Sequence, residues 1–125
     1  MKPLTIFVND QVAFEYDKEA AVDDQKLAFF EKMDADMNRG IKIQGEFIAD
    51  PNAKQRATFV AMNLIRALKQ DNQAIILASC AYLANRLPAL IEVHVRDSGN
   101  TVNVELVEEH QNKKAHLLDV EQITP

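Results

Sequence analysis

An acidic segment of this 125-residue sequence has the spacing of a metal site. It runs Asp34-Ala35-Asp36-Met37-Asn38-Arg39-Gly40-Ile41 and is followed by an acid at position 46. The pattern resembles an EF-hand loop, with oxygen ligands at alternate positions, although the glycine and the distal acid come one residue late. The candidate metal ligands are therefore Asp34, Asp36, Asn38 and Glu46.

The metal site requires the helix predicted before it to end near Met33. On a continuous helix Asp34 and Asp36 would point about 200° apart and could not share an ion. Met37 repeats Met33 four residues later on the apolar stripe, which favours a helix that continues to Asn38. A metal-binding function is thus one hypothesis, and a solvated helix end is the other.

A second group of residues could carry acid–base chemistry. A turn at Ser98-Gly99 would make Glu92 and Glu105 cross-strand neighbours, with His94 beside them. Two close carboxylates raise the pKa of one of them, and an imidazole can relay a proton. These three residues are the catalytic candidates of a small hydrolase or isomerase, although the alternation is also typical of any half-exposed strand.

Other catalytic signals are absent from the sequence. Cys80 is the only cysteine, and its apolar neighbours predict a buried, unreactive thiol. Three scattered glycines form no phosphate loop, and there is no H-E-x-x-H, G-x-S-x-G or C-x-x-C motif. We therefore expect no cofactor. The sequence leaves catalysis open and favours a non-catalytic protein.

The charge balance excludes two classes of partner. Fourteen Lys and Arg against 19 Asp and Glu give a net charge of −5 and an isoelectric point near 5.1. Nucleic-acid binding needs a basic stripe, and an anionic membrane surface needs basic clusters. No apolar run has the length of a membrane span, and the first residues do not have the pattern of a signal peptide. We expect a cytoplasmic protein.

Hydrophobic periodicity predicts an α+β domain over residues 1–108, followed by a polar tail over 109–125 that could be partly disordered. The expected order is ββ-ααα-ββ: a small antiparallel sheet packed on three helices. Its elements are a hairpin over 4–16 with a three-residue loop, a helix over 20–38, a helix capped at 50–51, a helix over 73–87 and a hairpin over 91–106. The segment 41–49 is a short strand or an ordered loop. The third helix is apolar nearly all round, so we expect it at the centre.

An apolar surplus predicts a protein interface. Phe59 and Met62 lie opposite the core stripe of the second helix, beside Arg66, and Phe7 alternates away from the apolar side of the first hairpin. Exposed aromatic and methionine patches mark partner surfaces. We predict an interaction or assembly module with a protein partner, a second copy in a homodimer being the first choice. The alternative is that Phe59 and Met62 are covered within the monomer.

Two blocks of the sequence, Met33-Asp34-Ala35-Asp36-Met37-Asn38-Arg39-Gly40 and Arg86-Leu87-Pro88, flank an alanine-rich helix over 72–85. Together they resemble a family of small uncharacterised bacterial proteins, over about residues 30–97. The resemblance implies a bacterial, cytosolic protein with one compact domain. It implies no activity and no site residues.

Overall fold

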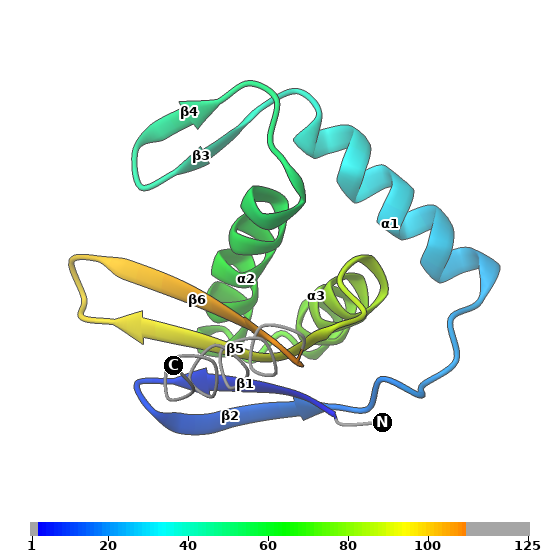
Figure 1. The fold of residues 1–125 in the computed structure, drawn as a ribbon, viewed down its shortest axis with the longest axis horizontal. Helices are drawn as coiled ribbons and strands as arrows, with labels where there is room; N and C mark the ends of the chain where they lie inside the picture. The colour runs from blue at the N-terminus through cyan, green and yellow to red at the C-terminus, as the bar shows by residue number, and fades with distance from the viewer. Residues whose placement is uncertain (1–2, 110–125) are drawn as a thin grey trace, which may run out of the picture.

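The structure, a computed structural model, describes residues 3–109 and has two hairpins joined into one sheet (Figure 1). The elements are β1 (Leu4–Val8), β2 (Gln11–Tyr16), α1 (Asp24–Met37), β3 (Ile41–Ile43), β4 (Glu46–Ile48), α2 (Ala53–Lys69), α3 (Gln73–Arg86), β5 (Leu90–Asp97) and β6 (Val102–Glu108). The α+β class is confirmed. The segment 41–49 forms the small β3–β4 hairpin, so the order is ββ-α-ββ-αα-ββ.

The sheet is mixed, and the prediction of an antiparallel sheet was wrong. Its strand order is β2-β1-β5-β6, and β1 runs parallel to β5 while the two outer pairs are antiparallel. The central strands carry the most deeply buried side chains of the sheet, including Leu4, Ile6 and Val93 at 0% exposure. Joining the hairpins through these strands buries both of them and leaves β2 and β6 at the edges.

The first hairpin has the predicted pairing at its base and a different tip. Leu4 faces Tyr16 and Ile6 faces Phe14, as expected, but a bulge after Ile6 shifts the register. The loop is therefore two residues long, and both of its residues have positive φ, as a type I′ turn requires. Sequence alternation could not reveal the bulge because it absorbs one residue without changing the pattern at the base.

The second hairpin is shifted by two residues from its predicted register. Val95 pairs with Val104 rather than with Val102, because the loop spans four residues, 98–101, instead of two. The Asp97 carboxylate accepts from the Gly99 amide at 3.0 Å inside this loop. A shift of two residues keeps every side chain on its face, so the apolar face is as predicted while the cross-strand neighbours are not.

The helix limits follow the capping residues. Helix α1 begins after Asp23, whose carboxylate accepts from the Lys26 amide, rather than at residue 20. Helix α2 begins after Asn52, which forms a reciprocal capping box with Gln55, so the predicted start at residues 50–51 was two residues early. Helix α3 begins after Asn72, as predicted, and ends at Arg86.

Helices α2 and α3 cover one face of the sheet, and α1 lies across them (Figure 1). The inner face of α3 is buried, with Leu83 and Cys80 at 0% exposure. Its outer face is not covered: Ile75 and Leu77 are 40% and 48% exposed. The prediction of α3 as a central core helix is thus confirmed for one face and wrong for the other.

Asn9 extends the parallel β1–β5 ladder with its side chain. Its Nδ2 donates to the Asp97 carbonyl oxygen at 3.1 Å, and its Oδ1 accepts from the Asp97 amide at 2.9 Å. Asn9 also has φ +51°, which asparagine tolerates better than most residues. We expect Asn9→Ala to lower the free energy of unfolding by about 1 to 3 kcal/mol in urea denaturation. Asn100→Ala in the other hairpin loop is the control, and an equal loss there would contradict this role.

Candidate functional site

The structure does not bring the four predicted metal ligands together. Helix α1 continues to Met37, so Asp34 and Asp36 lie on different sides of it, and Glu46 lies on β4. Within residues 3–109, no three histidine, cysteine, aspartate or glutamate side chains lie close enough together to hold a metal ion. The Asp34 carboxylate turns toward α3, where it has other partners.

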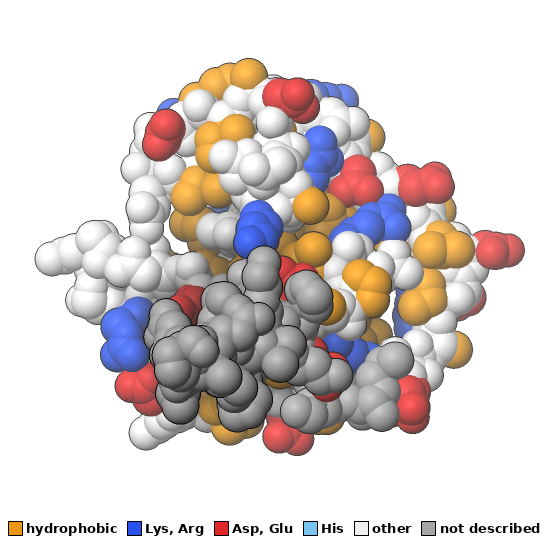
Figure 2. Space-filling view, in the orientation of Figure 1, with side chains coloured by type: hydrophobic (Ala, Val, Ile, Leu, Met, Phe, Trp, Pro, Cys, Tyr) orange, Lys and Arg blue, Asp and Glu red, His pale blue; other side chains and the backbone are white. Residues whose placement is uncertain are grey.

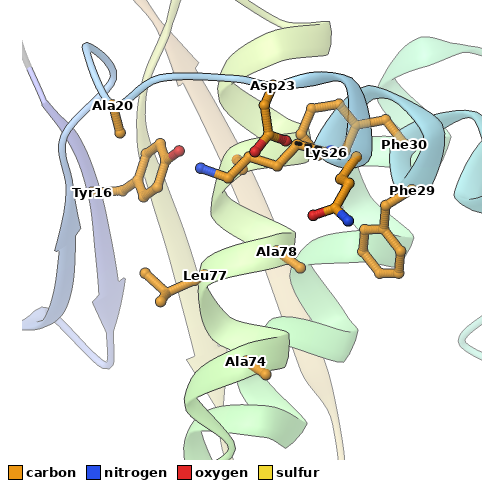
Figure 3. Close-up of a pocket in the computed structure, with 11 residues that line it drawn as sticks. Tyr16, Ala20, Asp23, Lys26, Phe29, Phe30, Ala74, Leu77 and Ala78 are labelled. Carbon is orange, nitrogen blue, oxygen red and sulfur yellow. Dashed lines mark hydrogen bonds between the residues drawn. The ribbon is translucent and has the colours of Figure 1, made fainter.

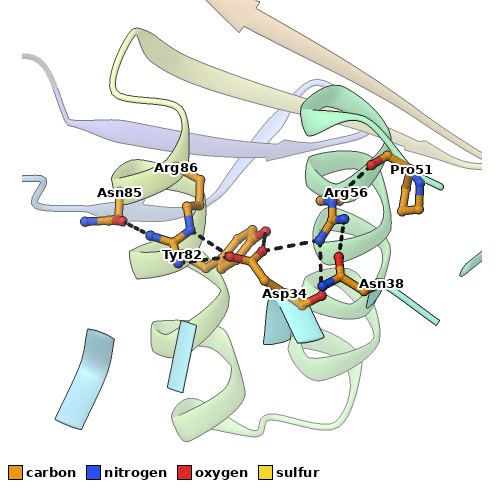
Figure 4. A network of polar contacts seen from close by, with 7 residues as sticks. All are labelled: Asp34, Asn38, Pro51, Arg56, Tyr82, Asn85 and Arg86. Atoms are coloured by element: carbon orange, nitrogen blue, oxygen red, sulfur yellow. Dashed lines mark hydrogen bonds and ion pairs between the residues drawn. The ribbon is translucent and has the colours of Figure 1, made fainter. Parts of the chain in front are cut away.

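These partners form a polar cluster that joins the three helices (Figure 4), here called the Asp34 cluster. Its members are Asp34, Asn38, Arg56, Tyr82 and Arg86. One carboxylate oxygen of Asp34 accepts from the Tyr82 hydroxyl, and the other accepts from Arg86 Nε at 3.1 Å and Nη2 at 2.9 Å. Arg56 Nη1 donates to the Asp34 carbonyl oxygen at 3.1 Å, and its Nη2 donates to Asn38 Oδ1.

The charges and hydrogen bonds of the Asp34 cluster connect the three helices. Burial and the hydrogen bond to Asp34 raise the pKa of the Tyr82 hydroxyl, which keeps it a donor at neutral pH. The Arg86 guanidinium lies 5.6 Å from the ring centres of both Phe30 and Tyr82. Through these contacts the cluster holds the C-terminal half of α1 on α2 and α3, while the side chain of Asp34 stays 31% exposed.

The predicted acid–base residues lie on the sheet face opposite the helices. His94 Nε2 is 2.8 Å from Glu92 Oε1, and the His94 ring stacks on Phe7 with 4.4 Å between ring centres. The register shift places Glu105, not Asn103, opposite His94, so the expected cross-strand pair of Glu92 and Glu105 is absent. The face thus holds an imidazole between two acidic residues, and its catalytic role stays a prediction.

The monomer half-buries three of the four predicted interface residues and leaves the fourth exposed. Phe59 is half-buried and packs against the core, and Met62 is also half-buried. Phe7 is half-buried under the His94 ring. Arg66 is exposed. The monomer thus covers much of the surface that the sequence assigned to a partner.

Cys80 is fully buried, as predicted, and burial raises the pKa of its thiol to about 12.

A different apolar surface is exposed where α1 crosses α3. Phe29, Ile75 and Leu77 are 42%, 40% and 48% exposed. Hydrophobic side chains gather at the right of Figure 2, at about mid-height, where the N-terminal half of α1 lies. The sequence predicted α3 at the centre of the fold, because this helix is apolar nearly all round. That prediction therefore missed this surface.

Two hollows flank Phe29 on this surface. The Tyr16 pocket, of about 420 Å³, lies between β2, α1 and α3 and includes Tyr16, Lys26, Phe29 and Leu77 in its wall (Figure 3). The α2–α3 groove, of about 300 Å³, includes Phe29, Arg66 and Ile75. We call the three exposed side chains with these two hollows the Phe29 face.

The chain matches no family model, no curated protein and no solved structure. The family resemblance over residues 30–97 therefore stays a prediction. None of the helices within residues 3–109 combines the length and the apolar character needed to cross a bilayer. The predicted tail lies outside the described residues apart from Glu109, whose amide donates to the Ala89 carbonyl oxygen at 2.8 Å.

Proposed function

We propose that this protein is a non-catalytic interaction module that associates with a second copy of itself through the Phe29 face. The observation that carries the proposal is the joint exposure of Phe29, Ile75 and Leu77 around two hollows. Ile75 and Leu77 lie on opposite edges of the exposed side of α3, about 200° apart, and Phe29 borders the hollow beside each of them. Large apolar side chains exposed around hollows are typical of surfaces that bind something. The proposal keeps Arg66 from the sequence-based interface and replaces Phe59 and Met62, which the monomer half-covers.

A second copy suits this face because its features complement each other. An aromatic side chain, Phe29, stands between two hollows, so a two-fold axis near it would bring each ring toward a hollow of the other copy. The two ends of the face also differ in charge: Asp23 and Asp24 lie at the start of α1, and Arg66 lies at the edge of the α2–α3 groove. The same two-fold axis would place the acidic end of one copy over the basic edge of the other.

Sedimentation velocity over a range of protein concentrations tests the proposal. We expect a concentration-dependent dimer, and we expect Ile75→Gln to raise its dissociation constant at least tenfold, or by about 1.4 kcal/mol. The substitution removes an exposed apolar side chain, so the free energy of unfolding of the monomer should change by about 0.5 kcal/mol or less.

Val12→Gln is the matched control, because Val12 is 57% exposed on β2 and lines neither hollow. The Val12→Gln dimer should have the same dissociation constant as the wild-type dimer. A strict monomer at the highest concentrations, or equal weakening by both variants, would overturn the proposal.

A further inference from the structure

The Tyr16 pocket has the size and lining of a ligand site. Its volume of about 420 Å³ falls within the range, about 300 to 1,000 Å³, of pockets that hold small molecules. Phe30, Leu77, Ala78 and Ala81 form an apolar wall along α1 and α3 (Figure 3). Such a wall takes up hydrocarbon and offers it no hydrogen bonds.

Tyr16 and Lys26 carry donors at the mouth of this pocket (Figure 3). Tyr16 is only 7% exposed, and within residues 3–109 its hydroxyl has no hydrogen-bond partner. The Lys26 ammonium donates to the Ala21 carbonyl oxygen at 2.8 Å and forms no ion pair with any described carboxylate. The Tyr16 hydroxyl oxygen reaches solvent, because among the described residues no side-chain oxygen or nitrogen is both buried and unpartnered, so this hydroxyl can donate to a ligand at the mouth.

The mouth of the pocket carries one positive and one negative side chain, Lys26 and Asp23. The Asp23 carboxylate is directed at the start of α1, where its Oδ1 accepts from the Lys26 backbone amide at 2.9 Å, whereas the Lys26 ammonium has no carboxylate partner among the described residues. Burial raises the pKa of Tyr16, so its hydroxyl keeps its proton at neutral pH. An ammonium and a phenolic hydroxyl at the mouth of one pocket can both donate to one carboxylate.

We propose that the Tyr16 pocket binds a free aliphatic carboxylate. The hydrocarbon chain lies against the wall formed by Phe30, Leu77 and Ala78, and the carboxylate accepts from the Lys26 ammonium and the Tyr16 hydroxyl. A carboxylate matches both donors because it only accepts hydrogen bonds. Its negative charge also pairs with the Lys26 ammonium, which has no carboxylate partner among the described residues.

This inference stands apart from self-association, although the pocket belongs to the Phe29 face and a second copy would compete with the ligand. Binding is therefore measured on the Ile75→Gln variant, because Ile75 lines the α2–α3 groove and not the Tyr16 pocket. If the wild-type protein is a monomer and the variant binds the ligand, the proposal of self-association is wrong and the proposal of ligand binding stands. If the wild-type protein dimerises and the variant binds no ligand, the proposal of self-association stands and the proposal of ligand binding is wrong.

The experiment titrates sodium decanoate, below its micelle concentration, into this variant and follows methyl resonances by NMR. We expect shifts concentrated at Ala20, Ala74, Ala78 and Ala81, which line the pocket. Decyltrimethylammonium has the same chain length and the opposite charge, so it should bind at least tenfold more weakly. Equal binding of the cation, or shifts spread over other surfaces, would overturn the proposal.

Two further substitutions test the head-group contacts. Adding Lys26→Gln should weaken decanoate binding about tenfold, and adding Tyr16→Phe, which keeps the ring, should weaken it about threefold to tenfold. Lys32→Gln, on the same helix and away from the pocket, is the matched control and should leave binding unchanged. The inference fails if Lys26→Gln and Lys32→Gln bind decanoate equally well, and the melting temperature of each variant shows that it is folded.

Discussion

Asp34→Ala is expected to lower the free energy of unfolding by about 3 kcal/mol. The substitution leaves the Tyr82 hydroxyl, on a residue that is 2% exposed, without its acceptor, and it removes the carboxylate between Arg56 and Arg86. Breaking a buried ion pair costs about 3 to 5 kcal/mol, and the side chain of Asp34 is 31% exposed, which places the estimate at the lower end. Urea denaturation followed by circular dichroism measures the change.

Asp36→Ala is the matched control for this prediction. Asp36 lies two residues further along α1, is exposed and has no side-chain partner among the described residues, so its replacement should cost about 0.5 kcal/mol or less. Tyr82→Phe should fall between the two, at about 1 to 2 kcal/mol, because it removes one donor and keeps the ring. Losses for Asp34→Ala and Asp36→Ala that agree within 0.5 kcal/mol, about the scale of a surface change, would contradict the role assigned to the cluster.

The sequence contained enough local information for most elements of the fold. Alternating residues identified both hairpins of the sheet and their apolar faces, and the predicted start of α3 at residue 73 is confirmed. Where two capping signals competed, the sequence was ambiguous: Asp50-Pro51 is a good helix start, but Asn52 with Gln55 satisfies two backbone groups at once and defines the true one. Loop lengths were missed for a similar reason, since a bulge or a four-residue loop leaves the alternation intact.

The candidate sites were harder to predict because they depend on how distant segments meet. The spacing of Asp34, Asp36 and Asn38 suggests a calcium loop, yet Asp34 is held by Tyr82 and Arg86, which lie about fifty residues away in sequence. Periodicity shows which side of a helix is apolar and does not show whether a neighbour is long enough to cover it. An all-round apolar α3 therefore looked like a core helix, whereas α1 covers only part of its outer face.

Leu83→Ala and Leu77→Ala form a matched pair that tests this division of α3. Both replace the same residue type within the same helix, so the change in helix propensity cancels and the difference reports burial. Leu83 is 0% exposed and Leu77 is 48% exposed. We expect losses of about 3 to 4 kcal/mol for Leu83→Ala, since a buried leucine also leaves a cavity, and about 1 kcal/mol or less for Leu77→Ala.

Chemical denaturation of the two variants side by side measures this difference. Equal losses would mean that both faces of α3 are buried, which would remove the exposed surface on which self-association and carboxylate binding both depend. A large loss for Leu83→Ala alone would separate the two roles of this helix physically. Leu83 would then be a core residue that holds α3 in place. Leu77 could be replaced without unfolding the protein, so Leu77→Ala could be used to weaken binding at the Phe29 face in a folded chain.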